Sequence, residues 1–346
     1  MGIQEEIDAI RKKLDEESKV TVKIALFGQP GAGKSSLINK IIGKDVAEVG
    51  VETDKTVDEQ KYEHNGLFFS DLPGYGTERF PEETYFEQFK IPEFDLFLCV
   101  TSGKLHQADS RFFKKLKSLN KACIFIVNKC DTLWEDGFTE QELEERKVLD
   151  IKKHVEDDVL VIFTSCRNNK GLDRVNIEIQ RLLDDAKKER WARCAKAYSA
   201  DFLAKKKAAC EKYVSYAALA AAANGINPIP GLDVSVDIGV LVKLFKEIRE
   251  SYGLNDDYLA FLEKSAVPMV GQLANSVVKY AAQEGVILLL RQVAGRQAVK
   301  TFSKYIPFAG QIIAAGVGYA ITSNAGSKYL DSCHNLAEEA LQNNLK

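Results

Sequence analysis

Residues 20–42 read VTVKIALFGQPGAGKSSLINKII, and this stretch decides the fold. An apolar run rich in β-branched residues ends in a glycine-rich turn, and a helical pattern follows from Lys34 to Ile42. The turn from Gly28 to Ser35 matches G-x-x-x-x-G-K-[ST] in the strand–turn–helix setting that this motif requires. The sequence therefore predicts a phosphate-binding loop at the start of an α/β domain. A purely structural glycine-rich turn is the weaker alternative in that setting.

Further apolar runs predict the rest of the sheet. Asn65-Gly66 is a hairpin signal between two short strand patterns. Three later runs, at 96–100, 123–127 and 159–163, have the continuous apolar character of parallel strands buried on both faces. Polar helical stretches separate them, so we expect an α/β P-loop GTPase domain with a mostly parallel sheet and one antiparallel hairpin strand.

The texture of the chain changes after residue 185. Residues 185–213 are charged and helical, and the following sequence is rich in Ala, Gly, Val and Leu with few strand signals. We therefore expect an amphipathic N-terminal helix (1–19), a G domain (20–185) and a C-terminal helical domain (186–346). The N-terminal helix lies outside the α/β pattern and is expected to pack on an all-α domain that both chain ends form.

The bulk composition excludes several classes of protein. A net charge of −3 gives no basis for general attraction to nucleic acid. Seven scattered cysteines without a C-x-x-C pair predict reduced thiols, with no disulfide partner and no zinc site. The N-terminal segment is charged and lacks the apolar core of a signal peptide, so a cytoplasmic location is expected.

The glycine-rich loop supplies most of the expected phosphate contacts. Its backbone N–H groups and the helix N-terminus would cradle the phosphates. Lys34 would reach the β- and γ-phosphates as a catalytic residue, and Ser35 would offer an oxygen to magnesium. The nucleotide-binding positions expected in this loop are Gly28, Gly31, Gly33, Lys34, Ser35 and Ser36.

A second motif, Asp71-Leu-Pro-Gly74, directly follows the second hairpin strand. A carboxylate at a strand end beside a phosphate loop can hold magnesium, usually through water, and the N–H of Gly74 can then sense the γ-phosphate. Asp-x-x-Gly alone is also a common turn. Its position on the next core strand favours a metal-binding role for Asp71.

A third motif, Asn128-Lys-Cys-Asp131, ends another apolar strand and predicts the base. Asp131 would accept the N1–H and the exocyclic amine of guanine, whereas adenine would leave this carboxylate unpaired. Asn128 would brace the loop and reach N7, and the stem of Lys129 would cover the ring. Backbone N–H groups at Ser165 and Cys166 are expected to meet guanine O6. The expected ligands are GTP or GDP with Mg²⁺.

The sequence leaves the residues for two catalytic roles undecided. Thr56 is expected to be the switch threonine that binds magnesium and acts in catalysis, with Thr53 as the alternative. Tyr75 stands where many GTPases place a Gln that orients the attacking water, so a low intrinsic rate is expected unless a second copy of the domain, backbone groups or another side chain helps. The nearby candidates are Asp58, Glu59, Glu78 and Arg79.

Helical segments after the G domain carry a family resemblance. Residues 226–237 and 305–316 each place Pro and Gly before a helix of small and branched residues. With the three motifs in this order, DLPGYGT at 71–77 and LFKEIRESYGL at 244–254, nearly the whole chain resembles the immunity-related GTPases. The resemblance implies GTP hydrolysis by a large GTPase, a nucleotide-dependent homodimer or homo-oligomer formed through the G domain, and action at intracellular membranes in defence against microbes.

Membrane contact and turnover have open alternatives. Residues 305–327 are uncharged and long enough to cross a bilayer, but their moderate hydropathy favours a buried helical hairpin. A hairpin that packs in one state and touches lipid in another is the third option, and it would give peripheral membrane contact. The alternative function is a GTP-loaded scaffold with little turnover. A ribosome-assembly role is opposed by the acidic balance of the chain.

Overall fold

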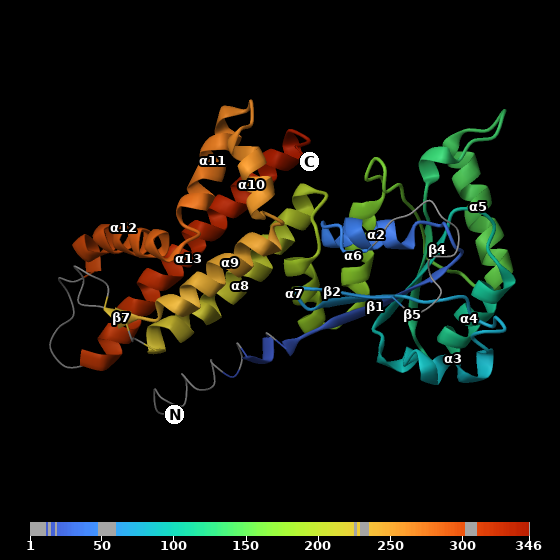
Figure 1. Ribbon diagram of the computed structural model, residues 1–346, viewed down its shortest axis with the longest axis horizontal. Helices are drawn as coiled ribbons and strands as arrows, with labels where there is room; N and C mark the ends of the chain where they lie inside the picture. The colour runs from blue at the N-terminus through green and yellow to red at the C-terminus, as the bar shows by residue number, and fades with distance from the viewer. Residues whose placement is uncertain are drawn as a thin grey trace. The chain divides into compact units, whose positions relative to one another are not determined.

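The chain forms two compact units in a computed structural model (Figure 1). The structure describes residues 12, 15–17, 19–47, 60–224, 227–228, 235–301 and 310–345. One unit spans Val20–Tyr198, and the other is built from Ser199–Lys346 with the N-terminal segment. The expected packing of the 1–19 helix rests on residues that lie largely outside the described ones.

The Val20–Tyr198 unit is built on a six-stranded sheet with the order β2-β3-β1-β4-β5-β6. The strands are β1 (Val22–Gly28), β2 (Gln60–His64), β3 (Leu67–Asp71), β4 (Leu96–Thr101), β5 (Ala122–Val127) and β6 (Val161–Phe163). Only β2 and β3 pair antiparallel in the described sheet, and the other neighbours are parallel. The predicted α/β class, with one antiparallel hairpin strand, is confirmed.

Helices cover both faces of this sheet (Figure 1). They are α2 (Lys34–Ile42), α3 (Glu82–Gln88), α4 (Gln107–Ser118), α5 (Glu140–Val155), α6 (Leu172–Leu182) and α7 (Asp185–Cys194), with 3-10 turns at Ile91–Glu93 and Cys130–Thr132. Alternate residues of a strand point to opposite faces. Phe27 of β1 therefore meets Phe112 of α4 edge-on at 4.7 Å, within the aromatic core under α3, α4 and α5. On the other face, Phe69 of β3 meets Trp191 of α7 at 6.3 Å.

The first unit extends past the boundary expected at residue 185. Helix α7 packs on this unit because Trp191 is fully buried and its indole N–H donates to the Asn176 carbonyl at 3.1 Å. The stretch 185–213, expected to be charged and helical, is divided between α7 and α8 (Ala200–Asn224). Between these two helices, the N–H of Lys196 donates to the Ile41 carbonyl and the Tyr198 hydroxyl donates to the Lys40 carbonyl, so tertiary contacts with α2 replace helical hydrogen bonds.

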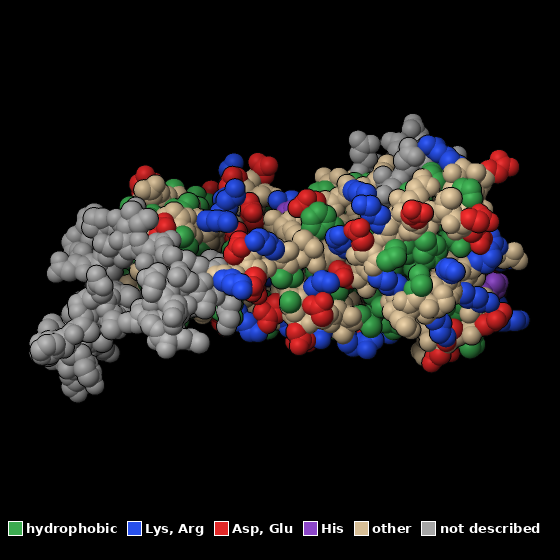
Figure 2. Space-filling view, turned by 90° about the horizontal axis from the view of Figure 1, so that it is seen from below, with side chains coloured by type: hydrophobic (Ala, Val, Ile, Leu, Met, Phe, Trp, Pro, Cys, Tyr) green, Lys and Arg blue, Asp and Glu red, His purple; other side chains and the backbone are tan. Residues whose placement is uncertain are grey.

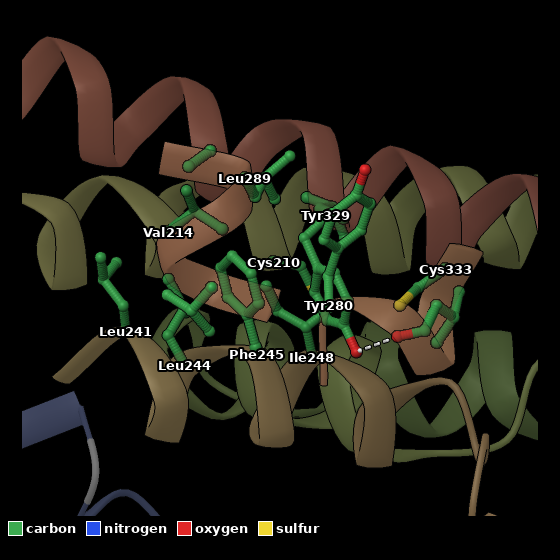
Figure 3. Packing of buried hydrophobic residues seen from close by; sticks show 14 of the residues in the cluster. Cys210, Val214, Leu241, Leu244, Phe245, Ile248, Tyr280, Leu289, Tyr329 and Cys333 are labelled. Atoms are coloured by element: carbon green, nitrogen blue, oxygen red, sulfur yellow. Dashed lines mark hydrogen bonds between the residues drawn. The ribbon is translucent and has the colours of Figure 1, made fainter. Parts of the chain in front are cut away.

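The second unit is predominantly helical. Its helices are α8 (Ala200–Asn224), α9 (Ile238–Ser251), α10 (Asp256–Glu263), α11 (Pro268–Lys279), α12 (Gln283–Thr301) and α13 (Gly310–Gln342). A small exception to the expected all-α domain is the two-residue pairing of β7 (Asn227–Pro228) with β8 (Ser235–Val236). Residues from α8, α9, α12 and α13 form one apolar cluster, shown from close by in Figure 3.

Small residues let α13 lie close to α8 in this cluster. A Cβ added at Gly326 would stand 2.6 Å from Val214 Cγ1, so any larger residue would push the helices apart. One turn earlier, the buried Thr322 hydroxyl lies 3.2 Å from the Ala218 carbonyl of α8 and donates at 2.7 Å to Gly318 of its own helix. Phe245 of α9 stacks on Tyr329 of α13 with ring centroids 4.2 Å apart. These contacts fit the predicted role of the small residues.

A membrane-spanning helix is not found among the described residues, because no helix there is both long enough and apolar enough. Part of the 305–327 segment lies outside the described residues. From Gly310 onward it belongs to the single long helix α13, and Thr322 and Ala325 are fully buried within the helical unit.

Candidate nucleotide-binding site

The three sequence motifs come together at one edge of the sheet. Strands β3, β1, β4, β5 and β6 are parallel, so their carboxyl ends meet at the same edge. The glycine-rich loop follows β1, Asp71 ends β3, Asn128 follows β5 and Thr164 follows β6. Ligands of open α/β sheets bind at this edge. The loops there form the candidate site.

The glycine-rich loop needs glycine at two positions for steric reasons. A Cβ at Gly28 would lie 2.1 Å from the Val100 carbonyl oxygen, and a Cβ at Gly33 would lie 2.4 Å from Nδ2 of Asn128. Gly28, Gly31 and Gly33 all have positive φ angles, of 124°, 74° and 91°. Gly31 is exposed, and a Cβ there would meet nothing within 4 Å among the described residues, so only its backbone conformation favours glycine.

Helix α2 begins directly after this loop with its N-terminal N–H groups uncapped. Gly33 offers no side-chain cap, and the first turn of α2 contains no acidic residue. Ser35 and Ser36 lie half-buried in this first turn. An uncapped helix N-terminus preceded by a glycine-rich loop is suited to bind phosphate oxygens.

Lys34 and Asp71 form a buried pair of opposite charges beside the loop. Lys34 is 6% exposed and Asp71 is 1% exposed. Lys34 Nζ donates to the carbonyls of Gly28 at 3.1 Å and Gln29 at 3.2 Å. It lies 3.6 Å from Asp71 Oδ1, which is too long for a hydrogen bond, and that oxygen has no hydrogen-bond partner among the described residues.

The Asp71 carboxylate fits the requirements of a magnesium site. Burial raises its pKa to about 6, while the nearby positive charge of Lys34 opposes that rise. A buried carboxylate oxygen without a hydrogen-bond donor is suited to a cation. In the described residues no group of three or more His, Cys, Asp or Glu could hold a metal. Asp71 and Ser35 are the described residues that would hold a magnesium ion here, and the ion would offset the charge of bound phosphates.

Asn128 joins the base motif to the phosphate loop. Its Nδ2 donates to the Ala32 carbonyl at 2.9 Å, and its backbone N–H donates to the Thr101 carbonyl at 2.7 Å. Its Oδ1 accepts from the Thr164 hydroxyl at 3.1 Å and from the Cys166 thiol at 3.6 Å. Burial raises the pKa of Cys166, which keeps this thiol protonated as a donor. One buried side chain thus braces the loops after β1 and β6.

The side chains expected to meet the base are exposed. Lys129 has a left-handed backbone (φ 58°), and both Lys129 and Asp131 project from the 3-10 turn at Cys130–Thr132. The loop backbone is fixed by the N–H of Cys130, which donates to the Thr164 carbonyl at 3.0 Å. The Asp131 carboxylate is therefore held at the rim of the site by its backbone, with its acceptor oxygens facing solvent.

Of the two positions expected to meet guanine O6, one has its backbone donor engaged. The N–H of Ser165, a fully buried residue, donates to the Lys170 carbonyl at 3.0 Å. In the part of the chain that the structure describes, no acceptor is found for the N–H of Cys166, which is half-buried. The geometry therefore favours Cys166 over Ser165 as a donor to a bound base.

The segment after Asp71 is held by aromatic residues of α3 and α4. Gly74 is exposed at the site, and its carbonyl accepts from the Thr77 hydroxyl at 3.2 Å. Tyr75 turns away into the core and is 8% exposed, with its ring 5.1 Å from Tyr85 and 4.9 Å from Phe112. The Tyr85 hydroxyl donates to the Pro73 carbonyl at 2.6 Å. This ring cluster fixes the segment that leads out of the candidate magnesium site.

Tyr75 also takes part in a polar chain at the edge of that cluster. Its hydroxyl donates to Glu82 Oε2 at 3.2 Å, and Arg111 Nε donates to Glu82 Oε1 at 2.8 Å. Burial and the neighbouring Glu82 carboxylate raise the pKa of Tyr75 to about 12. The phenol therefore stays neutral, and its geometry does not present it to an attacking water.

Several predicted residues lie outside the described ones or outside the site. Thr53, Thr56, Asp58 and Glu59 belong to the undescribed range 48–59. Glu78 and Arg79 are described and exposed, and the guanidinium of Arg79 lies over the Phe80 ring at 5.4 Å. Tyr85 and Arg111 were not predicted from the sequence. Each lies on a helix well past the Asp71 motif, and only the packing of α3 and α4 brings it to this segment.

The sheet order and the joining of the phosphate loop to the base motif through Asn128 place this unit in the class of P-loop GTPases. A family model described as Interferon-inducible GTPase (IIGP) matches residues 2–286. The chain belongs to this family, in agreement with the resemblance seen in its sequence.

Two curated relatives align over most of the chain. Interferon-gamma-inducible GTPase 10 of Mus musculus is 25% identical over 354 residues, which cover 95% of this chain and 83% of that protein. Interferon-inducible GTPase 5 of Bos taurus is 25% identical over 380 residues, covering 97% of this chain and 77% of that protein. Interferon-inducible GTPase 1 of Mus musculus is 31% identical over 139 residues, which cover 38% of this chain and 33% of that protein.

Proposed function

We propose that this protein binds GTP with Mg²⁺ in the candidate site and hydrolyses it to GDP and phosphate. The observation that carries the proposal is the bond from Asn128 Nδ2 to the Ala32 carbonyl. It joins a motif suited to guanine with a loop suited to phosphate. Family membership supports the same activity, since the relatives are named GTPases.

At the phosphate end, the loop N–H groups and the start of α2 bind the β- and γ-phosphates. Lys34 leaves its carbonyl partners to neutralise charge that develops on the γ-phosphate. Bound magnesium would supply charge neutralisation between the two phosphates. Ser35 and Asp71 would hold this ion together with the switch threonine Thr56. Gly74 offers its N–H to the γ-phosphate.

At the base end, Asp131 accepts the two guanine donors and gives selectivity over adenine. A buried or ligand-covered carboxylate without its donors is costly, so the wrong base is rejected. The Lys129 stem covers one face of the ring. Cys166 N–H is the better-placed donor to O6, and Asn128 holds the loop from beneath.

Water positioning is the missing element of the reaction. Tyr75 is buried among aromatic rings, and none of the described residues takes its place. We propose that self-association through the G domain completes the site, which makes the rate depend on protein concentration. A charged or polar group from a second copy would stabilise the transition state without a fixed base. Peripheral membrane contact in cellular defence is the further expectation drawn from the family.

The experiment is GTP turnover per molecule measured over a range of protein concentrations. A specific activity that rises with concentration supports catalysis completed by self-association. Lys34→Ala is the control, and it should show neither binding nor turnover. Tight GTP binding with a flat and very low rate would refute the catalytic proposal. It would favour the second candidate, a GTP-loaded scaffold, which the burial of Tyr75 supports.

A further inference from the structure

The loop between the base motif and α5 carries two exposed aromatic side chains, Trp134 and Phe138. Trp134 is 80% exposed and Phe138 is 44% exposed, although tryptophan is highly buried on average. The second tryptophan of the chain, Trp191, is fully buried. Trp134 makes no ring contact and no hydrogen bond with any described residue. An indole that is mostly exposed on a surface loop, without a ring contact or hydrogen bond to the described residues, is typical of a recognition site.

A hollow of about 420 Å³ opens beside this pair. Its apolar lining includes Leu133, Trp134, Phe138 and Leu143. Its polar lining includes Asp131, Glu140, Asn168 and Lys170, and the Lys170 ammonium donates to Glu140. The lining is therefore amphipathic: Lys170 is bound to Glu140, and Asp131 is exposed. A flat or aliphatic group that ends in a positive charge matches such a lining.

The charge of this segment is strongly negative. Residues 131–147 contain seven Asp or Glu and two Lys or Arg, a net charge of −5, whereas the whole chain carries −3. On the face drawn in Figure 2, basic and acidic side chains are mixed over the described residues. The concentration of one sign in this short segment therefore selects for a basic partner.

Some of these acidic side chains already have partners within the chain. Glu140 and Glu144 accept from Lys170, and Glu142 closes a capping box with Thr139 at the start of α5. Asp136 has no ion pair or hydrogen bond with the described residues around it. It stands two positions from Trp134 in the same exposed loop, so an indole and a carboxylate are both without partners there.

The same loop already holds one guanidinium in this way. The guanidinium of Arg146 lies over the Phe138 ring at 4.5 Å, and its Nη1 lies 3.2 Å from Glu135 Oε2. Arginine is suited to such a place because its planar group can stack on a ring and donate to a carboxylate together. Trp134 and Asp136 repeat the pairing of ring and carboxylate without an internal cation.

We propose that Trp134, Asp136 and the hollow beside them bind an arginine side chain on a basic segment of a protein partner. The guanidinium of this arginine stacks on the indole and donates to Asp136. The aliphatic stem of the same arginine packs against the apolar lining of the hollow. Neighbouring basic residues of the partner meet the acidic segment 131–147. This site goes beyond the GTP chemistry proposed above. It shares Asp131 with the proposed base site, but its defining contacts are those of Trp134 and Asp136.

The fluorescence of Trp134 can report binding directly. The other tryptophan, Trp191, is buried, so acrylamide does not readily quench it. A short oligoarginine peptide is titrated into the full chain without nucleotide. We expect saturable protection of Trp134, with acrylamide quenching reduced about threefold. Oligolysine should bind about threefold more weakly, since an ammonium stacks less well on a ring. Oligoglutamate should not protect. Equal binding of oligolysine and oligoarginine would contradict the stacked geometry.

Variants are tested by fluorescence anisotropy of dye-labelled oligoarginine. Trp134→Ala should weaken binding about tenfold and Asp136→Asn about threefold. Leu149→Ala is the matched control, since Leu149 is 67% exposed on α5 and does not line the hollow. Unchanged binding in Trp134→Ala would overturn the proposal, and so would a fall of the same size in Leu149→Ala.

Other occupants of the surface give distinct results. If GTP alone protects Trp134 from acrylamide, the hollow belongs to the nucleotide site. If protection follows protein concentration without peptide, and sedimentation shows a dimer that Trp134→Ala abolishes, a second copy covers this surface. Either result refutes the arginine site. Lys34→Ala separates the two proposals, because this variant should lose GTP and keep oligoarginine binding.

Discussion

The phosphate end and the base end of the candidate site are built in opposite ways. At the phosphate end, Lys34 and Asp71 are both buried and face each other at 3.6 Å. At the base end, Lys129 and Asp131 are exposed, and only the backbone and the buried Asn128 beneath them are fixed. Buried charges are costly unless they are paired, whereas exposed charges contribute little to stability. Changes at the phosphate end should therefore affect folding and binding together, and changes at the base end should affect binding alone.

The largest effect is expected for Lys34→Ala, which tests the claim for the phosphate end. GTP affinity should fall by at least about a thousandfold, because the phosphates lose their cation and Asp71 is left as a buried unpaired charge. Isothermal titration calorimetry measures this loss. Lys40→Ala on the same helix is the control and should bind GTP normally.

The same variant has a defined pH dependence of stability. The pKa of Asp71 is raised by burial to about 6, above its unfolded value near 4, so its contribution to stability falls as pH rises from about 4 to 6. Without Lys34, this pKa rises further and the cost grows above pH 6. The melting temperature of Lys34→Ala should therefore fall more, relative to the wild type, at pH 8 than at pH 5. An equal fall in melting temperature at both pH values would contradict the claim that Lys34 offsets the buried charge of Asp71.

Substitutions at Gly33 and Gly31 test the contact between the phosphate loop and Asn128. Gly33→Ala places a Cβ at 2.4 Å from Asn128 Nδ2 and should cost about 3 kcal/mol of unfolding free energy, with a loss of GTP binding. Gly31→Ala is the matched control, since it has a similar positive φ but nothing within 4 Å among the described residues, and about 1–2 kcal/mol is expected. Urea denaturation measures both. Similar losses would mean that backbone strain, and not the contact with Asn128, governs this loop.

Asp131→Asn tests the base end. GTP affinity should fall about a hundredfold, because the amide cannot accept both guanine donors. Xanthosine triphosphate should gain affinity, since the new N–H can donate to its 2-oxo group. The unfolding free energy should change by less than about 0.5 kcal/mol, since this side chain is exposed. A marked loss of stability would show that the two ends are not built differently.

The smallest effect is expected for Tyr75→Phe, which keeps the ring and removes the hydrogen bond to Glu82. About 1 kcal/mol of unfolding free energy should be lost. GTP turnover should stay within about twofold of the wild type, because the phenol faces the core rather than the phosphates. Denaturation and turnover assays measure the two quantities. A tenfold fall in turnover would give Tyr75 a direct part in the chemistry.

The sequence predicts the sheet and the three motifs well, because their signals are local. A strand, a glycine-rich turn and a helix follow one another within residues 20–42, and the burial of β4 and β5 agrees with their continuous apolar runs. Contacts between residues far apart in the chain could not be predicted, because they leave no local signal. Asn128 and Ala32 are 96 positions apart in the chain, so their bond depends on the order of the strands.

The extension of the first compact unit to Tyr198, past the expected end near residue 185, has a similar cause. The charged pattern over 185–213 is helical in the sequence, yet α7 belongs to the first unit because Trp191 fills the sheet face beside Phe69. Helical propensity is a weak prior that tertiary contacts override. The burial of Tyr75 is also invisible in the sequence, since its partners Tyr85 and Phe112 come from later helices.

The Lys34–Asp71 pair makes the phosphate end nearly electroneutral. On our proposal, magnesium nucleotide enters by exchanging partners: Lys34 passes from the carboxylate to phosphate, and Asp71 passes from the ammonium to the metal. Either ion arriving alone would leave one buried charge without a counterion. Metal and nucleotide should therefore enter as a single complex, and free nucleotide without the metal should be a poor competitor for the site.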